Sequence, residues 1–449
     1  MRSFRLATPI GRGEVLVLAL FALCLADMAG GGYATWPAFA ALAASLVLFL
    51  VAMVQHERLP LGSVPPLTGP AFAALMVLRF GLGVPVVIWS ATAMAILAAL
   101  AGLTSYPLLR YLSLAALLLT WAVTVGLWLA IFPIHIDVLT VLHGGAMRLL
   151  HGLNPYTGSY RSTTPGVRTV PYDYGPVTVL LSVPAVLLGH VRYANAVLGA
   201  AGLLALSALA SRAVEHRGLT SYRALIPTTI CLPLMTLLIW SGWTDVYVVA
   251  PLGWWLLVRD RHPRVAIALL ATAFGGTLLV APFMVPLVLW SPRVRREALF
   301  AAAGALLVLY GPFILWTGVS RFLYDTVGFF IGLPAIPNSL ALQSLLAFFG
   351  LPGPNLVVTV TLLVVACVAL TFWKPSDLSD LLLASAAFGF VAFLVNRWAF
   401  FDYWALVCYV LLAAAATVGT SEPTALPHPL ARSHERLLSF AFGAEHDGS

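Results

Sequence analysis

Apolar residues recur in long, continuous runs along almost the whole chain, and short polar or charged segments separate these runs. Trp36–Val54 and Leu112–Ile131 are examples, and each is long enough to cross the hydrocarbon core of a bilayer as a helix. The strands of a membrane barrel would instead alternate apolar and polar residues. The pattern therefore predicts an all-α fold, a polytopic transmembrane helical bundle of about 11–14 membrane segments.

Basic residues orient this predicted bundle, because cytoplasmic loops carry an excess of Lys and Arg. The N-terminus is basic, and so is the connection that carries Arg259, Arg261 and Arg264. Counting spans from the N-terminus puts the long polar loop 133–174 on the opposite, extracytoplasmic side. We therefore divide the chain into an N-terminal four-helix membrane segment (1–111), a transmembrane core (112–420) and a flexible cytoplasmic tail (421–449).

The composition agrees with this class of protein. Hydrophobic residues make up 61% of the chain and charged residues 9%, whereas about a quarter of an ordinary soluble domain is charged. The net charge of +7 then reports cytoplasmic loops rather than a nucleic-acid partner. The cysteines lie inside apolar runs without metal-like spacing, which is typical of core residues. No nucleotide-binding motif stands out.

Two apolar regions do not fit simple spans. Residues 175–189 are apolar but short for a full crossing, so we expect a partial helix followed by one full span from Tyr193. Val265–Trp290 has basic residues at both ends, and Gly275, Gly276 and Pro282 interrupt its middle. This pattern predicts a bent hairpin that enters and leaves on the same side, as broken helices do beside a protein-buried cavity.

The extracytoplasmic loop 133–174 contains a helical period over residues 135–152. Its apolar face would carry Val138, Leu142, Ala146, Leu149 and Leu153, and its polar face Asp137, Thr140, Gly144, Arg148 and His151. This predicts an amphipathic helix along the membrane surface, with Gly152 as its terminator. A mobile loop (157–169) and an aromatic, proline-bounded re-entry into the membrane (170–176) are expected to follow.

The acidic residues assigned to the extracytoplasmic side are few, and most of them lie next to an apolar span. A carboxylate at the hydrocarbon edge is costly unless it is paired or faces a polar cavity. We therefore expect these side chains to converge on a site: Asp137, Asp173, Asp245, Asp325 and Asp402.

The order and spacing of these motifs resemble the GT-C superfamily of membrane-embedded glycosyltransferases. They are similar in particular to the family-87 and related polyprenyl-phosphate-mannose-dependent α-mannosyltransferases of actinobacteria. The resemblance covers about Leu112 to Val418. It is carried by Asp137, the turn Leu149–Tyr156 and the re-entry Tyr172–Pro176, with weaker matches at Ser241–Asp245, Asn338–Leu340 and Phe401–Trp404.

The resemblance implies a GT-C-like fold and transfer of a hexose, with mannose the first choice. The donor would be a polyprenyl-phosphate sugar and the acceptor a glycolipid or lipoglycan at the lipid bilayer, with no metal, cofactor or nucleic acid. Asp137 would be the general base, and its other reading is a cap of the surface helix. Candidate substrate-binding residues are Arg148, His151, Tyr172, Asp173, Tyr174, Asp245, Arg397 and Asp402.

The chain also departs from that family. Relatives often carry a lysine near the proline of the bent hairpin, whereas the residues before Pro282 are apolar here. Two other classes of function therefore stay open. Broken helices also occur in transporters and lipid flippases of the cell envelope. An envelope-assembly scaffold without chemistry would tolerate substitution of the extracytoplasmic Asp and Arg residues.

Overall fold

The computed structural model describes most of the chain from residue 35 onward. The described ranges are 35–54, 106–131, 136–163, 167–215, 226–329, 339–372, 377–396 and 401–417, with isolated positions at 19, 22–23, 26, 93–94, 96–97, 100 and 375. The predicted four-helix segment 1–111 lies mostly outside these ranges. The predicted tail 421–449, Arg397 and His135 lie wholly outside them.

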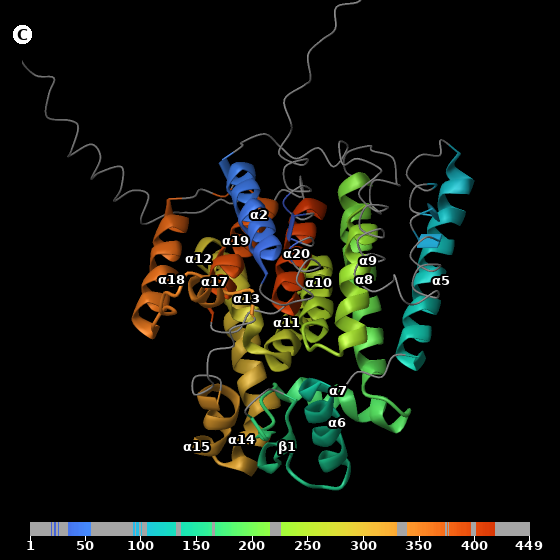
Figure 1. Cartoon of the computed structure of the whole chain (residues 1–449). Helices are drawn as coiled ribbons and strands as arrows, with labels where there is room; N and C mark the ends of the chain where they lie inside the picture. Colours follow the sequence, from blue (N-terminus) through green and yellow to red (C-terminus); the bar gives the residue numbers. More distant parts are fainter. Residues whose placement is uncertain are drawn as a thin grey trace, which may run out of the picture.

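Over the described residues the chain is mainly helical, which confirms the all-α prediction. Long helices stand side by side and form the body of the molecule (Figure 1). Two of their boundaries were predicted closely: the helix at Trp36–Val54 has the predicted bounds, and the next described helix ends at Ile131. The helices of this body are α2 (Trp36–Val54), α5 (Pro107–Ile131), α8 (Arg192–Glu215), α9 (Ile226–Ser241), α10 (Val246–Val258), α18 (Leu356–Thr371), α19 (Leu378–Val395) and α20 (Phe401–Ala416).

A group of short elements covers one end of this body, and we call it the cap layer (Figure 1). Its two-residue strands pair antiparallel, with Tyr160 opposite Val170. The elements of the cap layer are α6 (Asp137–Leu150), η1 (Pro155–Thr157), β1 (Tyr160–Arg161), β2 (Thr169–Val170), α7 (Pro176–Leu187), α14 (Gly311–Thr317), α15 (Val319–Leu323) and η5 (Tyr324–Gly328).

Three described helical stretches are long and apolar enough to cross a membrane: 192–212, 292–317 and 378–395. A bent pair, α11 (Pro263–Gly276) and the segment Leu278–Trp290, would be a fourth if it counts as one span. The other apolar stretches that meet the composition test are 10–17 residues long, and they include 36–48 of α2 and 115–127 of α5. Membrane-spanning helices are therefore supported, while the predicted number of crossings exceeds the number found among the described residues.

The bent pair matches the hairpin expected from the sequence. A 3-10 turn, η3 (Leu278–Val280), follows α11 and leads into α12 (Ala281–Trp290), and the chain bends by 116° at this break. The two ends of the pair come together, because Arg293 donates a hydrogen bond to the Arg259 carbonyl at 2.7 Å. A segment that leaves where it enters agrees with a re-entrant hairpin.

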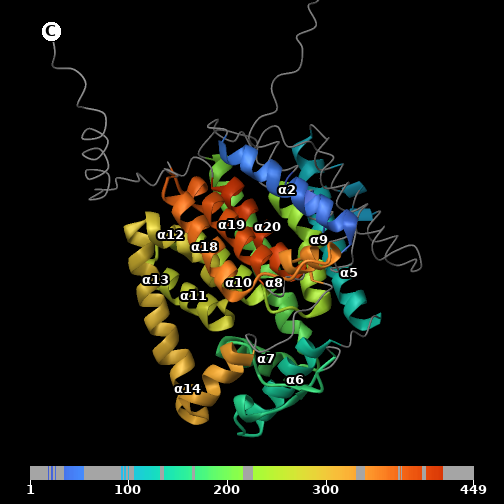
Figure 2. The same cartoon turned by 60° about the vertical axis from the view of Figure 1, so that its left-hand side comes forward.

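After this hairpin the chain forms one long rod at the edge of the molecule (Figure 2). The rod consists of α13 (Pro292–Gly304), the π-helix η4 (Ala305–Tyr310) and α14, and it joins the body to the cap layer. A further short helix, α17 (Leu342–Phe348), contacts α2 through Phe348, whose ring stacks on Trp36 at 5.2 Å.

The predicted amphipathic helix is α6, but its buried face differs from the prediction. Leu139, Val141 and Gly145 are buried together with the predicted Val138, Leu142 and Ala146. Leu153 is 50% exposed, because Gly152 adopts φ 70° and ends the helix before it. The predicted polar face is also partly covered, since the ring of Tyr160 lies over Gly144.

The segment expected to be a mobile loop, 157–169, is partly structured. Its ends form η1, β1 and β2, and the ring of Tyr160 is buried between α6 and the re-entry. The predicted partial helix and the full span after it correspond to α7, a 12-residue helix, and α8, a 24-residue helix. Pro176 starts α7, as proline favours the first position of a helix.

The buried side chains form two clusters. The larger lies between the long helices, and the smaller lies within the cap layer. The centre of the smaller cluster is aromatic, with the rings of Tyr156 and Tyr172 in edge contact at 5.2 Å. Trp243 packs against both clusters, so the turn before α10 joins the cap layer to the body.

Candidate functional site

Asp137 is the first residue of α6, and Ile136 is the N-cap. The Asp137 carboxylate accepts hydrogen bonds from the Val138 amide at 3.0 Å and the Ser162 hydroxyl at 3.2 Å. Its own amide donates to the Thr163 hydroxyl at 3.1 Å. The cap interpretation is therefore correct only in a limited sense, because the carboxylate binds an amide of the first turn from a position inside the helix. The Asp137 side chain is partly exposed, and hydrogen bonds from α6 and from the segment after β1 hold it in place.

Asp173 lies in the re-entry segment between two tyrosines. Tyr172 is fully buried, and its hydroxyl interacts with the Thr178 hydroxyl at 2.8 Å, which fixes the segment to the start of α7. The Tyr174 carbonyl accepts a hydrogen bond from the Tyr156 hydroxyl at 2.8 Å. Asp173 is therefore held by its neighbours on both sides, and its Oδ1 atom is shielded from solvent without a hydrogen-bond donor among the described residues.

This environment shifts the ionisation of Asp173. The pKa of Asp173 is raised to about 8, mainly by burial and also by the negative charges of Asp137 and Asp325, while a backbone hydrogen bond opposes the shift. Three carboxyl groups from α6, the re-entry and η5 are thus close enough to influence one another. Perturbed carboxyl groups of this kind are concentrated at functional sites.

A second carboxyl group pair lies at the adjacent ends of α10 and α20. Asp245 precedes α10 and is fully buried, and Asp402, in the first turn of α20, is 2% exposed. The two carboxyl groups lie close enough for each to affect the ionisation of the other. Two buried carboxyl groups this close cannot both ionise without a large electrostatic cost, so we expect one of them to keep a proton. Burial accordingly raises the pKa of Asp245 above its usual value.

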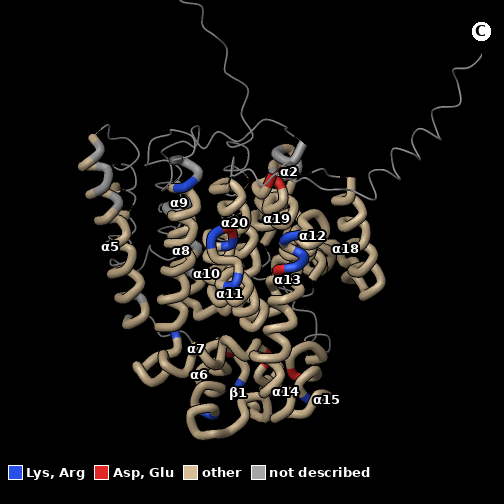
Figure 3. Tube along the Cα trace, turned by 180° about the vertical axis from the view of Figure 1, so that it is seen from behind, with Lys and Arg blue, Asp and Glu red and all other residues tan. Residues whose placement is uncertain are grey.

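The Tyr174 phenol lies close enough to both sets of carboxyl groups to be affected by their charges. Burial raises the pKa of the Tyr174 phenol, and the charges of Asp173, Asp137 and Asp402 raise it further. The acidic residues near α7, α14 and α15 lie apart from the charges of α11 and α13 (Figure 3). The sequence prediction that Asp137, Asp173, Asp245, Asp325 and Asp402 gather in one region therefore agrees with the structure.

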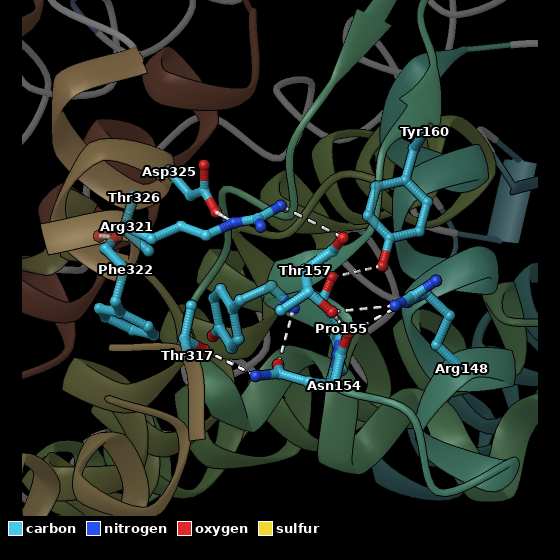
Figure 4. Close-up of polar contacts among 11 residues, drawn as sticks. Arg148, Asn154, Pro155, Thr157, Tyr160, Thr317, Arg321, Phe322, Asp325 and Thr326 are labelled. Atoms are coloured by element: carbon cyan, nitrogen blue, oxygen red, sulfur yellow. Dashed lines mark hydrogen bonds and ion pairs between the residues drawn. The ribbon is translucent and has the colours of Figure 1, made fainter. Parts of the chain in front are cut away.

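Arg148 takes part in a different network of the cap layer (Figure 4). Its guanidinium donates to the Asn154 carbonyl at 3.0 Å and to the Thr157 hydroxyl at 3.0 Å. Arg321 donates to the Thr157 carbonyl at 3.2 Å and lies 3.6 Å from an Asp325 oxygen. Both arginines therefore point toward the same turn, and Asp325 connects this network to Asp173.

The other predicted binding residues differ in how well the structure suits them. The exposed His151 ring contacts the Met147 carbonyl at 2.7 Å, within its own helix, and does not reach the carboxyl groups. Tyr172 is enclosed by aromatic rings, which is a packing role rather than an open stacking surface. Asp173, Tyr174, Asp245 and Asp402 are brought together.

Sequence reasoning missed two polar residues near the site. Asn195 of α8 is fully buried and donates to the Trp243 carbonyl at 2.7 Å, so it fixes the turn that carries Asp245. Arg192, at the start of α8, is 3% exposed and donates to the Leu129 carbonyl at 3.0 Å. It also reaches Trp240, and it thereby stabilises the C-terminal ends of α5 and α9. The sequence did contain a signal for Asn195 and Arg192, because both are polar residues at the start of a predicted span.

The described residues contain no group of three or more His, Cys, Asp or Glu side chains arranged to hold a metal ion. The chemistry that the set offers is hydrogen bonding and proton transfer by carboxyl groups in unlike environments. Comparison of the chain with family models, with curated proteins and with solved structures finds no match.

Proposed function

We propose that the protein is a polytopic membrane glycosyltransferase of the cell envelope. It transfers a hexose, for which the GT-C resemblance indicates mannose, from a polyprenyl-phosphate-sugar donor to a glycolipid or lipoglycan. The reaction takes place at the extracytoplasmic face of the cell membrane. The observation that carries this proposal is the gathering of carboxyl groups from separate segments at the cap-layer end of the helices.

In the proposed reaction Asp137 acts as the general base. It accepts the proton of an acceptor hydroxyl while that oxygen attacks the anomeric carbon of the donor sugar. The bond from the anomeric carbon to the phosphate oxygen breaks, and its electron pair leaves with the lipid phosphate. The partial exposure of Asp137 and its donors, Val138 N–H and Ser162, support this role, since they hold the carboxylate in place.

The remaining carboxyl groups suit recognition of the sugar. Both Oδ atoms of Asp245 and the Oδ1 atom of Asp402 are buried, and no hydrogen-bond donor to them is found among the described residues. Sugar hydroxyls are donors as well as acceptors, and a buried acceptor left without a donor costs free energy. Hydroxyl groups of a bound hexose would supply the missing donors at Asp173, Asp245 and Asp402.

Transfer of labelled mannose from polyprenyl-phosphate-mannose by membranes that contain the full-length protein tests the proposal. We expect Asp137→Ala to reduce transfer by at least about 100-fold, the lower range for general-base catalysis. Asp260→Asn is the matched control, because Asp260 is an exposed carboxylate paired with Arg293 at the far end of α10. Equal transfer by the wild type and Asp137→Ala would remove Asp137 from the mechanism.

A transporter or lipid flippase is the second candidate, and the Asp245–Asp402 pair favours it specifically. Buried ionisable residues within a membrane bundle often mark a proton or substrate pathway. Liposomes that contain the purified protein distinguish the two candidates. Solute-dependent flux without sugar transfer would support transport, and sugar transfer without flux would support the enzyme.

A further inference from the structure

The tip of the bent hairpin meets the candidate site through backbone alone. The Gly175 amide, in the re-entry, donates a hydrogen bond to the Gly276 carbonyl at 3.1 Å. On its other side Gly276 lies against the backbone of Tyr247, in the first turn of α10. The main chains of three segments that are distant in the sequence are therefore in direct contact.

These contacts leave no room for a side chain. A Cβ atom at Gly175 would lie 2.8 Å from the Gly276 carbonyl oxygen and still closer to that of Gly275. A Cβ atom at Gly276 would lie 3.1 Å from both the Cβ and the carbonyl oxygen of Tyr247. Glycine is thus required at Gly175, and a methyl group added at Gly276 would force Tyr247 or the hairpin tip to shift.

The two segments that the tip contacts both carry acidic residues of the candidate site. Asp173 lies two residues before Gly175, and Asp245 lies two residues before Tyr247. A displacement of the backbone at either contact would therefore move a carboxyl group with it. The tip lies between the segment of Asp173 and the segment of Asp245.

The hairpin is itself held at both ends. Near its tip, the Tyr310 hydroxyl donates to the Phe274 carbonyl at 2.8 Å. At its base, Arg293 donates a hydrogen bond to the Arg259 carbonyl at 2.7 Å. An element fixed at base and tip is a rigid support, and a reacting site needs its groups held to within about 0.5 Å.

We infer that the hairpin tip is a positioning element, with Gly175 and Gly276 as positioning residues that set the spacing between Asp173 and Asp245. The geometric part of this inference stands on the backbone contacts. Its consequence for catalysis rests on the proposed function.

Hydrogen exchange of the full-length protein in lipid nanodiscs tests the geometric part. We expect Gly276→Ala to raise exchange over residues 172–178 and 243–249 by roughly tenfold, because the added methyl group opens the stacked contact. Gly304→Ala is the matched control, since Gly304 is helical and a Cβ atom added there would meet nothing within 4 Å. Unchanged exchange in Gly276→Ala would overturn the inference.

Sugar transfer tests the catalytic part in the same samples. We expect Gly276→Ala to lower kcat for transfer from polyprenyl-phosphate-mannose by about 10- to 100-fold with little change in KM, the signature of misplaced groups. If Gly276→Ala does not fold, Tyr310→Phe is the second variant, because it loosens the tip without added bulk. We expect Tyr310→Phe to lower kcat by a smaller factor. Faster exchange with full transfer would overturn the positioning role. If the wild type transfers no sugar, the proposed function is refuted. The hydrogen-exchange experiment would still test the backbone contact at the hairpin tip.

Discussion

Two acidic residues of the same predicted loop have different surroundings. The Asp137 carboxylate is partly exposed and accepts hydrogen bonds from an amide and a hydroxyl. Asp173 has a shielded oxygen without a donor among the described residues, and burial favours its neutral form. Such a division between carboxyl groups suits a site in which one accepts a proton and another donates a hydrogen bond.

The raised pKa of Asp173 predicts a pH dependence of stability. Because the folded-state pKa is about 8 and the unfolded value is 3.8, the folded protein binds the extra proton between these values. Stability from this group is present below the unfolded pKa and is lost as pH rises through about 8, by up to about 1.4 kcal/mol per pH unit. Asp173→Asn should remove this loss, measured as Tm in detergent from pH 5 to 9. A variant whose Tm falls with pH as steeply as the wild type would contradict it.

The proximity of the buried Asp245 and Asp402 carboxyl groups predicts a retained proton at neutral pH. Infrared spectra of the wild type minus Asp402→Asn should contain the carbonyl band of a protonated carboxyl group, because the amide removes the shared proton. The control spectrum, wild type minus Asp260→Asn, should lack this band, since Asp260 is exposed and paired with Arg293. If both difference spectra lack it, the pair does not hold a proton.

At the scale of helices, the base of the hairpin depends on one buried carboxylate. Glu297 accepts a hydrogen bond from the Trp255 indole at 2.9 Å and from Arg293 at 3.1 Å, and it lies 3.8 Å from the buried Arg259. Loss of this charge would leave Arg259, which also lies 5.1 Å from the Trp255 ring, without its carboxylate. These contacts join α10 to α13.

We therefore expect Glu297→Leu to destabilise the protein by about 3–5 kcal/mol, the cost of breaking a buried ion pair from one side. Thermal unfolding in detergent measures the effect. Arg296→Gln is the control, because Arg296 is exposed on the same helix and its loss should cost little. Similar Tm values for the two variants would show that the Glu297 contacts contribute little to stability.

The sequence predicted the positions of helices and breaks better than it predicted the contacts between them. Continuous apolar runs located α2, the end of α5 and the break at Gly275–Gly276, because length and helix-breaking residues are local properties. The buried face of α6 was partly wrong, since Gly152 ends the helix and tyrosines from later in the chain cover its glycines. Asp325 was recognised as a loop residue, but its effect on Asp173 depends on a fold that periodicity does not encode.

At the scale of the whole molecule, the proposed topology puts the cap layer and the Arg261–Arg264 connection on opposite sides of a membrane. Ser159 and Arg261 are both exposed, so each can be replaced by cysteine with little disturbance. In intact cells a membrane-impermeant thiol reagent should label Ser159→Cys and should label Arg261→Cys only after permeabilisation. The unsubstituted chain measures the background from its own cysteines. Labelling of both positions in intact cells would contradict the topology.

The exposed apolar side chains agree with a lipid environment for the body of the molecule. Leu307, Val308 and Leu315 on the rod are 71–86% exposed, and Val357 on α18 is 72% exposed. Large exposed apolar patches mark surfaces that contact a membrane or another protein. Purification should therefore require detergent or lipid throughout.

Thr157 receives one arginine on its hydroxyl and another on its carbonyl, so a single residue couples the two halves of the cap layer. The two links differ in how evolution can alter them. A substitution such as Thr157→Val deletes the bond from Arg148, whereas the main-chain oxygen that binds Arg321 persists whatever side chain is present. Arg148 would still keep its bond to the Asn154 carbonyl, so both arginines would remain attached to this turn through main-chain oxygens that no substitution removes.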